Sequence, residues 1–533
     1  MERREASEGM CRGDEACGSA MCGSAMCGAA RDGVPERGAR TPGVSSRAGG
    51  ATATLADLPL EMQSLVMAKL GSPTDVVATQ LACRSLMEAG ESGGVWESLL
   101  EAERQKLGGL LSTDGAHPCA PADPKVLLRV ERRWFKGRAV SREVSLPDAV
   151  TPSRIFVTAR GALVASEADM GLYEVSLGAA GVVRGGALVA PPRDRPRVTC
   201  CSLNQKVACF GLEGGTMVVY DVEAALDALH VGDSPAPLDT FSLPGSTITS
   251  VDVASPRGAE ADTSVLSVAA GTAEGDVYVF ELELDRPMGA PPQRMRETTF
   301  SVDASVCFVK LRKTMEGKSL VATGTTGGFV YMHDCGTGAE MNSFIGCCSC
   351  PVQRISVSGD GRTVFASFSH VSKGNGHAPQ VLAWDVASGE RCAMLRVGLG
   401  GSTHSTAITA HAADDNKICV ASEDHVAVFP LSTDYVTGVA KQLYCLPLSD
   451  AQLQLDSKEN LSSADSNSYA RNLLSRTASA SHSASWSNKA ARSSGAGVKA
   501  TSLHCGAQVL AVTVAPDVAK KRPGCIRLFG FDH

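Results

Sequence analysis

One short pattern returns seven times along the chain, and it constrains the fold more than any other feature. Each copy is an apolar, strand-like run that ends in an aromatic residue or a histidine, followed in most copies by an acidic residue: Gly171–Glu174, Met217–Asp221, Val277–Glu281, Val330–Asp334, Val381–Asp385, Val426–Phe429 and Ile526–Phe529. The first six aligned positions are 47, 60, 53, 51 and 45 residues apart, and the seventh follows after about twice that distance. Such a period indicates a repeat fold in which each repeat forms one small sheet.

The residues around each run complete the repeat. An apolar strand, a tight turn, a second strand of small residues and a glycine-rich turn precede the run, from Thr151 onward. Gly214-Gly215, Gly275-Asp276 and Gly327-Gly328 stand where a two-residue hairpin turn needs a positive φ angle. Propeller blades have a period of about 40–45 residues before loop insertions. We therefore predict an all-β, seven-bladed propeller, with a β-sandwich as the alternative because strand alternation alone suits both folds.

One repeat resembles a WD repeat. Trp384-Asp385 ends its third strand, and Asp360 stands where that family has a turn-stabilising aspartate. The other six repeats lack the Gly-His signature, and Pro430 and Gly530 take the acidic position in the last two. The resemblance implies a WD-type propeller, and the departures concern the family's hydrogen-bonded tetrad rather than its sheet pattern.

The last repeat still needs its fourth strand. The sequence ends soon after Ile526–Phe529, whereas Arg138–Leu146 is strand-like, is bounded by Gly137 and Pro147, and belongs to no other repeat. An unpaired outer strand would be an aggregation risk. We therefore predict that Arg138–Leu146 pairs with the last repeat and closes the ring.

Ahead of the strands, residues 55–100 have helical periodicity. Apolar residues recur there at three- and four-residue steps: Leu58, Met62, Leu65, Val66 and Leu70. Pro59 is expected in the first turn of this helix, capped by Asp57 or Leu58, and a second helix opens at Thr74-Asp75. Three short helices cannot bury this many apolar side chains among themselves. The sequence therefore predicts a partner surface.

This stretch also resembles the F-box. The match rests on Leu58-Pro59, Glu61, Leu70, Asp75-Val76, Cys83-Arg84 and Val95-Trp96, and Gln80-Leu81-Ala82 and Leu86 depart from it. The resemblance implies binding to an SKP-type adaptor, and through it to a cullin, by Leu58, Pro59, Met62, Leu65, Val76, Cys83 and Trp96. Of these, Val76 and Trp96 are expected to hold the shape of the module. The alternative is a small helical bundle inside a larger domain.

A linker with one helix is predicted before the strands. After an expected loop from Ala102 to Asp123, Asp123 caps the helix and Pro124 occupies its first turn. Apolar residues share one face of this helix: Val126, Leu127, Val130 and Trp134. The spacing Trp134-x-x-Gly137 resembles the linker of F-box proteins that carry WD repeats.

Two segments are too poor in large apolar residues to fold. Residues 1–54 are rich in Gly, Ala, Ser and Arg, and residues 448–499 in Ser and Ala, so we predict disorder in both. The predicted domains are a disordered N-terminal region (1–54), an F-box helical module (55–103), a linker with a helix (104–137), the propeller (138–447 and 500–533) and a disordered Ser-rich insert between blades six and seven (448–499).

Composition excludes several classes of partner. The net charge of −7 and the pI near 5.9 argue against nucleic acid. No apolar run approaches the ~18 residues that a membrane span requires, so we expect no membrane partner. The 19 cysteines are diluted in a long chain without an apolar leader, which indicates reduced thiols in a cytoplasmic or nuclear protein.

No catalytic, metal or cofactor site is predicted. P-loop and His-Glu-x-x-His motifs are absent from the sequence. His404 and His411 are expected in surface or capping roles, and Cys200-Cys201 in the core. Cys347-Cys348-Ser349-Cys350 offers three crowded thiols, which cannot complete a tetrahedral metal site alone.

The two resemblances together imply a substrate-recognition subunit of an SCF-type cullin-RING ubiquitin ligase. In such a subunit the propeller binds the target protein, and a separate enzyme transfers ubiquitin. Arg154, Arg197 and Arg354 open innermost strands and are candidates for contact with a phosphorylated or acidic target. The alternative is a WD-repeat-like interaction scaffold with no ubiquitin-ligase role, and an enzyme that uses the propeller channel is a more distant possibility.

Overall fold

The computed structural model describes residues 54–55, 58–70, 72–92, 94–107, 123–147, 150–158, 161–176, 183–188, 196–243, 246–254, 265–284, 293–314, 317–346, 350–368, 380–397, 408–414, 416–422, 425–431, 442–448, 500–505, 509–516 and 523–531. The chain divides into two compact units, Met1–Thr54 and Leu55–His533, and every described helix and strand belongs to the second. Both segments with predicted disorder lie outside the described residues, except Thr54 and Leu448.

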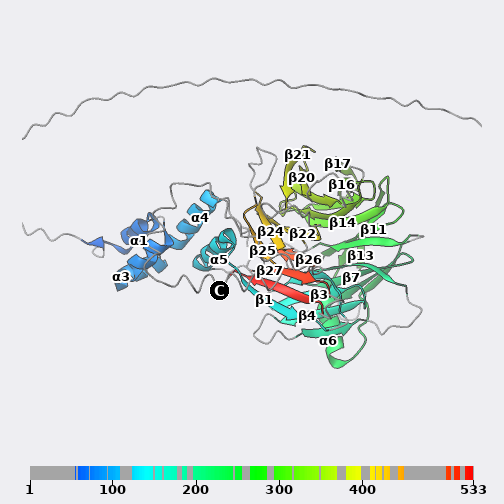
Figure 1. Ribbon diagram of the computed structural model, residues 1–533, viewed down its shortest axis with the longest axis horizontal. Helices are drawn as coiled ribbons and strands as arrows, with labels where there is room; N and C mark the ends of the chain where they lie inside the picture. The colour runs from blue at the N-terminus through cyan, green and yellow to red at the C-terminus, as the bar shows by residue number, and fades with distance from the viewer. Residues whose placement is uncertain are drawn as a thin grey trace, which may run out of the picture. The chain divides into compact units, whose positions relative to one another are not determined.

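Seven four-stranded antiparallel sheets contain the described strands (Figure 1). Blade one comprises β2 (Pro152–Val157), β3 (Gly161–Ser166), β4 (Gly171–Ser176) and β5 (Val183–Ala187). Blade two comprises β6 (Val198–Leu203), β7 (Val207–Leu212), β8 (Thr216–Asp221) and β9 (Asp239–Ser242). Blade three comprises β10 (Ile248–Val253), β11 (Val265–Thr272), β12 (Asp276–Glu283) and β13 (Gln293–Ser301).

The remaining blades follow in chain order, apart from one strand. Blade four comprises β14 (Val306–Lys313), β15 (Ser319–Thr325), β16 (Phe329–Asp334) and β17 (Glu340–Ile345). Blade five comprises β18 (Val352–Val357), β19 (Thr363–Phe368), β20 (Gln380–Asp385) and β21 (Arg391–Arg396). Blade six comprises β22 (Ala410–Ala413), β23 (Lys417–Ala421), β24 (His425–Pro430) and β25 (Tyr444–Pro447). Blade seven comprises β26 (Ala500–Cys505), β27 (Val509–Val514), β28 (Cys525–Gly530) and the early strand β1 (Val140–Ser145).

The first strands of the blades form a closed ring around the channel. Each contacts the first strand of the next blade, from β2 through β26 and back to β2. Three threonine hydroxyls in these strands donate to a carbonyl of the following blade: Thr199 to Ile248, Thr249 to Val306 and Thr501 to Pro152, at 2.5–2.6 Å. The predicted seven-bladed propeller is therefore confirmed, and the β-sandwich alternative is excluded.

The repeated run of the sequence is the third strand of every blade, as predicted. Gly215, Gly275 and Gly328 precede three of these strands with φ angles of 78°, 99° and 82°, in the region that the turns require. The acidic residue at the strand end has a structural role where it is Asp. The carboxylates of Asp221, Asp334 and Asp385 accept the backbone N–H three residues later, at 2.7–2.8 Å.

The propeller core consists of seven apolar layers, one between each pair of neighbouring blades. The layer between blades two and three, for example, combines Val219 and Phe241 with Val268 and Phe280. Cys200 and Cys201 are buried in two of these layers, which confirms their prediction as core residues. Because each blade packs only on its two neighbours, removing one strand weakens two layers.

The ring closes through β1, as the sequence predicts. Val140–Ser145 pairs antiparallel with β28, with Val144 opposite Ile526. Val144 of β1 and Leu146, directly after it, join the layer between blades seven and one and are 5 % and 3 % exposed. The outer edge of β28 is thereby paired.

Five helices precede the propeller: α1 (Leu60–Ala68), α2 (Pro73–Gln80), α3 (Arg84–Ser92), α4 (Val95–Leu107) and α5 (Pro124–Lys136). Pro59 is the N-cap of α1 and not a first-turn residue, because Leu60 is the first helical position. Helix α4 continues past Ala102 to Leu107, so the predicted loop begins later. Asp123 caps α5 as predicted, with its carboxylate accepting from the Lys125 N–H at 2.8 Å.

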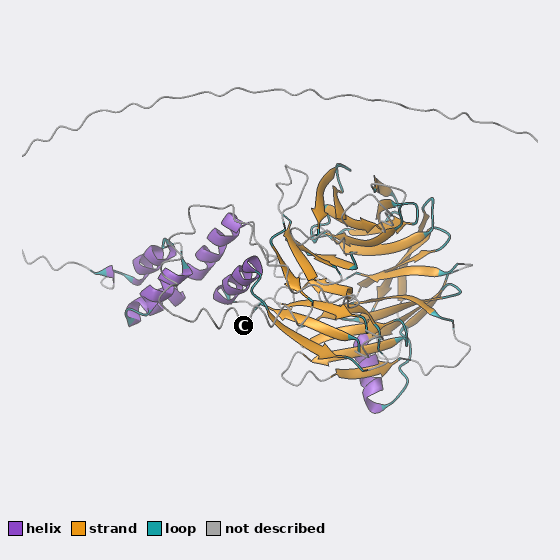
Figure 2. Cartoon of the chain, in the orientation of Figure 1, coloured by secondary structure: helices purple, strands orange, loops and turns teal. Residues whose placement is uncertain are grey.

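Helix α6 (Val222–Val231) is inserted between the third and fourth strands of blade two and was not predicted (Figure 2). Val222 and Ala225 bury against the layer between blades one and two. This insertion accounts for part of the 60-residue step in the sequence repeat, because it lies between Tyr220 and Phe280.

Candidate functional site

Helix α1 and its neighbours expose apolar side chains. Leu58, Met62 and Leu65 are 36, 47 and 54 % exposed, and Pro59 is exposed beside them. Of the fourteen large hydrophobic residues exposed in the described part of the chain, eight lie between residues 58 and 87: Leu58, Leu60, Met62, Leu65, Leu70, Val77, Leu81 and Met87. Such a concentration on so short a segment is typical of an interaction surface.

The inward face of α1 carries two polar residues, Gln63 and Ser64, beside Met67, which is 0 % exposed. Gln63 is 2 % exposed, and its amide donates to the Leu58 carbonyl at 2.6 Å and accepts from the Ser85 hydroxyl at 2.9 Å. The Ser64 hydroxyl donates to the Ala89 carbonyl at 2.8 Å. The buried polar groups are thus satisfied. The helix therefore holds its position through these polar contacts and the buried Met67, while Leu58, Met62 and Leu65 face solvent.

The seven predicted adaptor-binding residues fall into two groups. Leu58, Pro59, Met62 and Leu65 are exposed and available to a partner. Val76 and Trp96 are 0 % and 7 % exposed, in a core that Cys83 packs against. Val76 and Trp96 are therefore not exposed to a partner in this structure, and Cys83 is half-buried, so adaptor contact by these three residues stays a prediction. The expectation that Val76 and Trp96 hold the shape of the module agrees with their burial.

Helix α5 contacts both the helical module and the propeller. Leu128 belongs to the core of the module, whereas Val130 and Trp134 belong to the layer between blades six and seven. Two ion pairs join α5 to α4, both at 3.1 Å: Arg104–Glu131 and Arg132–Glu103. One helix thus packs against the cores of both parts.

The predicted Trp134-x-x-Gly137 linker has a physical basis. The Trp134 ring stacks on Phe531 with centroids 3.8 Å apart, and the Lys417 ammonium lies 4.3 Å from the Trp134 ring centroid. Gly137 ends α5 with a φ angle of 64°, and a Cβ atom there would lie 2.7 Å from the Tyr444 ring. Tryptophan is needed for the stacking and glycine for the close approach.

The structure brings together two of the three predicted target-binding arginines. Arg154 in β2 and Arg354 in β18 each place the guanidinium carbon 5.5 Å from the ring centroid of Phe308 in β14. Arg197, in contrast, is an exposed residue just before β6. Arg154 and Arg354 were predicted because they lie near the start of innermost strands. That signal did not indicate Phe308, whose ring lies near both.

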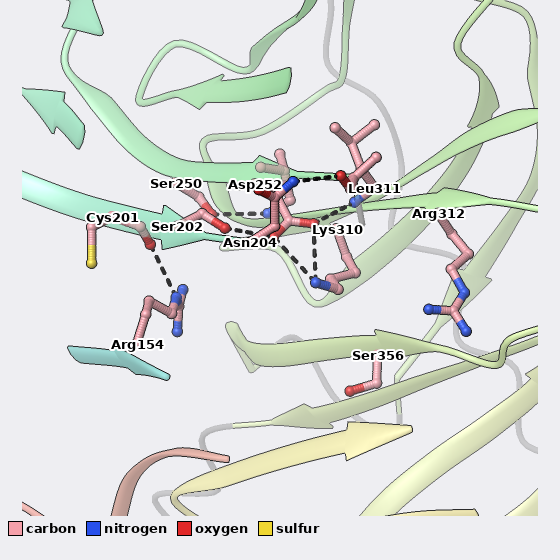
Figure 3. A network of polar contacts seen from close by, with 12 residues as sticks. Arg154, Cys201, Ser202, Asn204, Ser250, Asp252, Lys310, Leu311, Arg312 and Ser356 are labelled. Atoms are coloured by element: carbon pink, nitrogen blue, oxygen red, sulfur yellow. Dashed lines mark hydrogen bonds and ion pairs between the residues drawn. The ribbon is translucent and has the colours of Figure 1, made fainter. Parts of the chain in front are cut away.

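A polar network in the channel joins blades two, three and four (Figure 3). The Asp252 carboxylate, on a residue that is 6 % exposed, is its centre. It accepts from the Ser202 hydroxyl at 2.9 Å, the Leu311 N–H at 2.8 Å and the Lys310 ammonium at 3.1 Å. Asp252 was not among the predicted site residues, although an Asp between two valines of a first strand was a signal of a buried polar partner.

His411 is buried, and the prediction of a surface or capping role for it was wrong. It is 8 % exposed in β22, and its Nδ1 atom lies 2.8 Å from the Ser356 hydroxyl of blade five. Burial lowers the pKa of His411 to about 3, and the nearby Arg354 charge acts in the same direction. Apolar residues or cysteine take this position in the other six first strands: Ile155, Cys201, Val251, Val309, Ile355 and Leu503. His404 lies outside the described residues.

We expect His411 to reduce stability in acid. Its pKa is lower in the folded chain than the usual 6.5, so the unfolded chain binds the additional proton as the pH falls below about 6.5. The free energy of unfolding then decreases by up to ~1.4 kcal/mol per pH unit until the pH reaches the pKa of the folded state. His411→Val should flatten the dependence of the melting temperature on pH between 6.5 and 4, whereas exposed His230→Gln should not. Parallel curves for wild type and His411→Val would contradict this assignment.

The described residues contain no cluster of three or more His, Cys, Asp or Glu side chains able to hold a metal. Cys347, Cys348 and Ser349 lie outside that part of the chain, and Cys350 is half-buried. Among the helices that the structure describes, none combines the length and apolarity of a membrane span.

Comparisons with known proteins concern the fold. No protein family model matches the chain, and no curated protein matches it. Among solved structures, the chain is similar to one of U3-55K, with 12% identity and a TM-score of 0.47 over 73% of this chain and 98% of that one. It is similar to the RRP9 WD40 repeats with the same identity and TM-score, over 73% of this chain and 97% of that one. At this identity the likeness is one of architecture alone.

Proposed function

We propose that the protein is a non-catalytic scaffold that joins two protein partners, one on the helical module and one on the propeller. The observation that carries the proposal is the orientation of α1, which exposes Leu60, Met62 and Leu65 while Gln63 and Ser64 are buried. An isolated folded module gains nothing from exposing Leu58, Met62 and Leu65 to water, since burying each would contribute about 1.5–3 kcal/mol. A partner surface that covers them explains the arrangement.

The finer proposal names the partner of the helical module as an SKP-type adaptor. The support is that four of the seven residues to which the F-box resemblance assigns adaptor binding are exposed on α1 and its N-terminal turn: Leu58, Pro59, Met62 and Leu65. The chain would then be the substrate receptor of an SCF-type cullin-RING ubiquitin ligase, and its propeller would bind the target. A scaffold without a ligase role is the second candidate. The propeller fold alone supports protein binding and does not require a ligase.

The double change Leu58→Ala and Leu65→Ala should weaken adaptor binding at least tenfold. Interface energy is concentrated in a few apolar anchors, each typically worth ~2 kcal/mol on truncation. Both side chains are exposed, so the variant should melt like the wild type. Titration calorimetry of the full chain with a purified SKP-type adaptor measures the affinity.

Val231→Ala is the matched control, because this valine of α6 is 70 % exposed and lies in the propeller sequence. It should leave adaptor affinity within twofold of the wild type. If the wild-type chain does not bind the adaptor, the ligase role is wrong and the scaffold alternative takes its place. If it binds and the double variant binds equally well, α1 is not the interface.

A further inference from the structure

The seven outer strands of the propeller each have one edge that pairs with no strand of the described residues: β5, β9, β13, β17, β21, β25 and β1. Six of them carry a feature that discourages pairing with another chain. Strands β1, β5, β13 and β21 contain arginine, and β9 and β25 are only four residues long. Strand β17 has neither feature, since its only charged residue is Glu340 at the first position.

Strand β17 also exposes more large apolar side chains than any other outer strand in the described part of the chain. Met341 is 49 % exposed and Ile345 is 67 % exposed, and Ser343 between them is exposed as well. Strands β1 and β13 each have one such residue, Val140 and Met295. An uncharged edge with exposed apolar side chains is a template for pairing with another strand.

The backbone of β17 directs hydrogen-bonding groups to this open edge. The Gly346 N–H donates to the Gly328 carbonyl at 3.1 Å, on the side of the neighbouring strand β16. Because N–H groups alternate in direction along a strand, those of Ser343 and Ile345 point away from β16. The Ser343 N–H accordingly donates to the Asn342 Oδ1 atom, at 3.1 Å. A further strand can therefore add to β17 through its backbone.

We propose that β17 pairs antiparallel with β17 of a second copy of this chain, about a two-fold axis at Ser343. In this register Met341 of one copy lies opposite Ile345 of the other, and Ser343 lies opposite Ser343. Each exposed apolar side chain thereby gains an apolar cross-strand neighbour. The same patch serves both copies, as a two-fold interface requires. The pairing joins two four-stranded blades into one continuous sheet.

Charge and size set the strength of this contact. In the proposed register the two Glu340 residues lie at opposite ends of the paired strands, about 20 Å apart at ~3.3 Å per residue. This separation exceeds the Debye length of ~8 Å at physiological ionic strength, so their repulsion is screened. Six residues from each copy are far fewer than the ~20–30 a side of a standard interface. We therefore expect a weak dimer that forms in the micromolar range.

Sedimentation velocity of the full chain over micromolar concentrations tests the proposal. The wild type should shift reversibly from monomer to dimer. Ile345→Lys places a charge on the edge and should weaken the dimer at least tenfold. Val231→Lys is the matched control, because this valine of α6 is 70 % exposed and the change in charge is the same; it should alter dimer affinity less than twofold. Both variants should keep wild-type melting and adaptor binding, so that failure here is distinct from failure of the proposed function.

Paired charges test the register and the identity of the partner. Met341→Lys alone should also weaken the dimer at least tenfold. Adding Ile345→Glu to it places opposite charges across the two-fold axis and should recover at least threefold in affinity, whereas adding Ile345→Lys should recover none. The double variant Leu58→Ala, Leu65→Ala should dimerise like the wild type, because α1 is not the contact.

Two outcomes would overturn the proposal. One is a dimer that is lost in the Leu58→Ala, Leu65→Ala variant and kept in Ile345→Lys, since the helical module would then be the contact. The other is a wild-type chain that stays monomeric across the micromolar range, which would leave the β17 edge to a strand of another protein.

Discussion

A chain that starts at Thr151 is expected to aggregate, although it retains every strand of blades one to six. It lacks β1, whose six residues pair with β28. The loss exposes the edge of β28 in solution and removes Val144 and Leu146 from the layer between blades seven and one. Each of these side chains contributes about 1.5–3 kcal/mol on burial. The ion pair between Arg527 and Glu143, at 2.6 Å, is lost with them.

Two longer chains separate ring closure from helix docking. A chain that starts at Arg138 keeps β1 but lacks α5, so it should be soluble yet melt at a lower temperature, because Trp134 no longer covers Lys417 and Phe531. A chain that starts at Asp123 keeps both elements and should be the most stable. Solubility, melting temperature and hydrogen exchange of residues 526–529 provide the measurements. Equal behaviour of the chains from Arg138 and Thr151 would show that β1 does not close the ring.

The repeat architecture was predictable because its signals are local. A third strand needs an apolar run, the turn before it needs a residue with positive φ, and the Asp at its end caps the next turn, as at Asp221, Asp334 and Asp385. The apolar run recurs at every blade, and the turn residue and the Asp recur at several, so together they leave a period in the sequence. The pairing of β1 with β28 was predictable for a related reason, since one strand-like segment was left over and one blade lacked a strand.

The channel site was only partly predictable, because its members are distant in sequence. Arg154 and Arg354 were recognised by their positions near the start of first strands, but Phe308 lies in a third blade, and its contact with both depends on the curvature of the ring. His411 occupies a position that is apolar or cysteine in the other blades. A lone sequence cannot show that its imidazole turns toward Ser356.

The orientation of α1 was hidden for a different reason. A stripe of apolar residues at helical spacing usually marks the buried face of a helix. Here the stripe is exposed and Gln63, Ser64 and Met67 are buried, because the polar side chains of the first two find partners in Leu58, Ser85 and Ala89. Periodicity predicted the helix, and only the contacts decided which face looks inward.

Asp252→Ala should lower the free energy of unfolding by about 3 kcal/mol, because breaking a buried ion pair typically costs ~3–5 kcal/mol. The expected cost lies at the lower end of this range, because the Lys310 side chain is 35 % exposed and can turn toward water. The Leu311 N–H, in contrast, is buried in the sheet and would lose its acceptor. Because the carboxylate joins blades two, three and four, its loss weakens three blades at one point (Figure 3).

The conservative change and a surface control make this effect specific. Asp252→Asn keeps one acceptor oxygen for the Leu311 N–H but loses the charge that holds Lys310, so its cost should lie between wild type and Asp252→Ala. Asp233→Ala removes an exposed carboxylate after α6 and should stay within about 0.5 kcal/mol of wild type. Urea denaturation followed by tryptophan fluorescence gives the three free energies. If Asp252→Ala unfolds at the same urea concentration as Asp233→Ala, the carboxylate does not hold the blades together, and the strength of this part of the ring resides in the apolar layers alone.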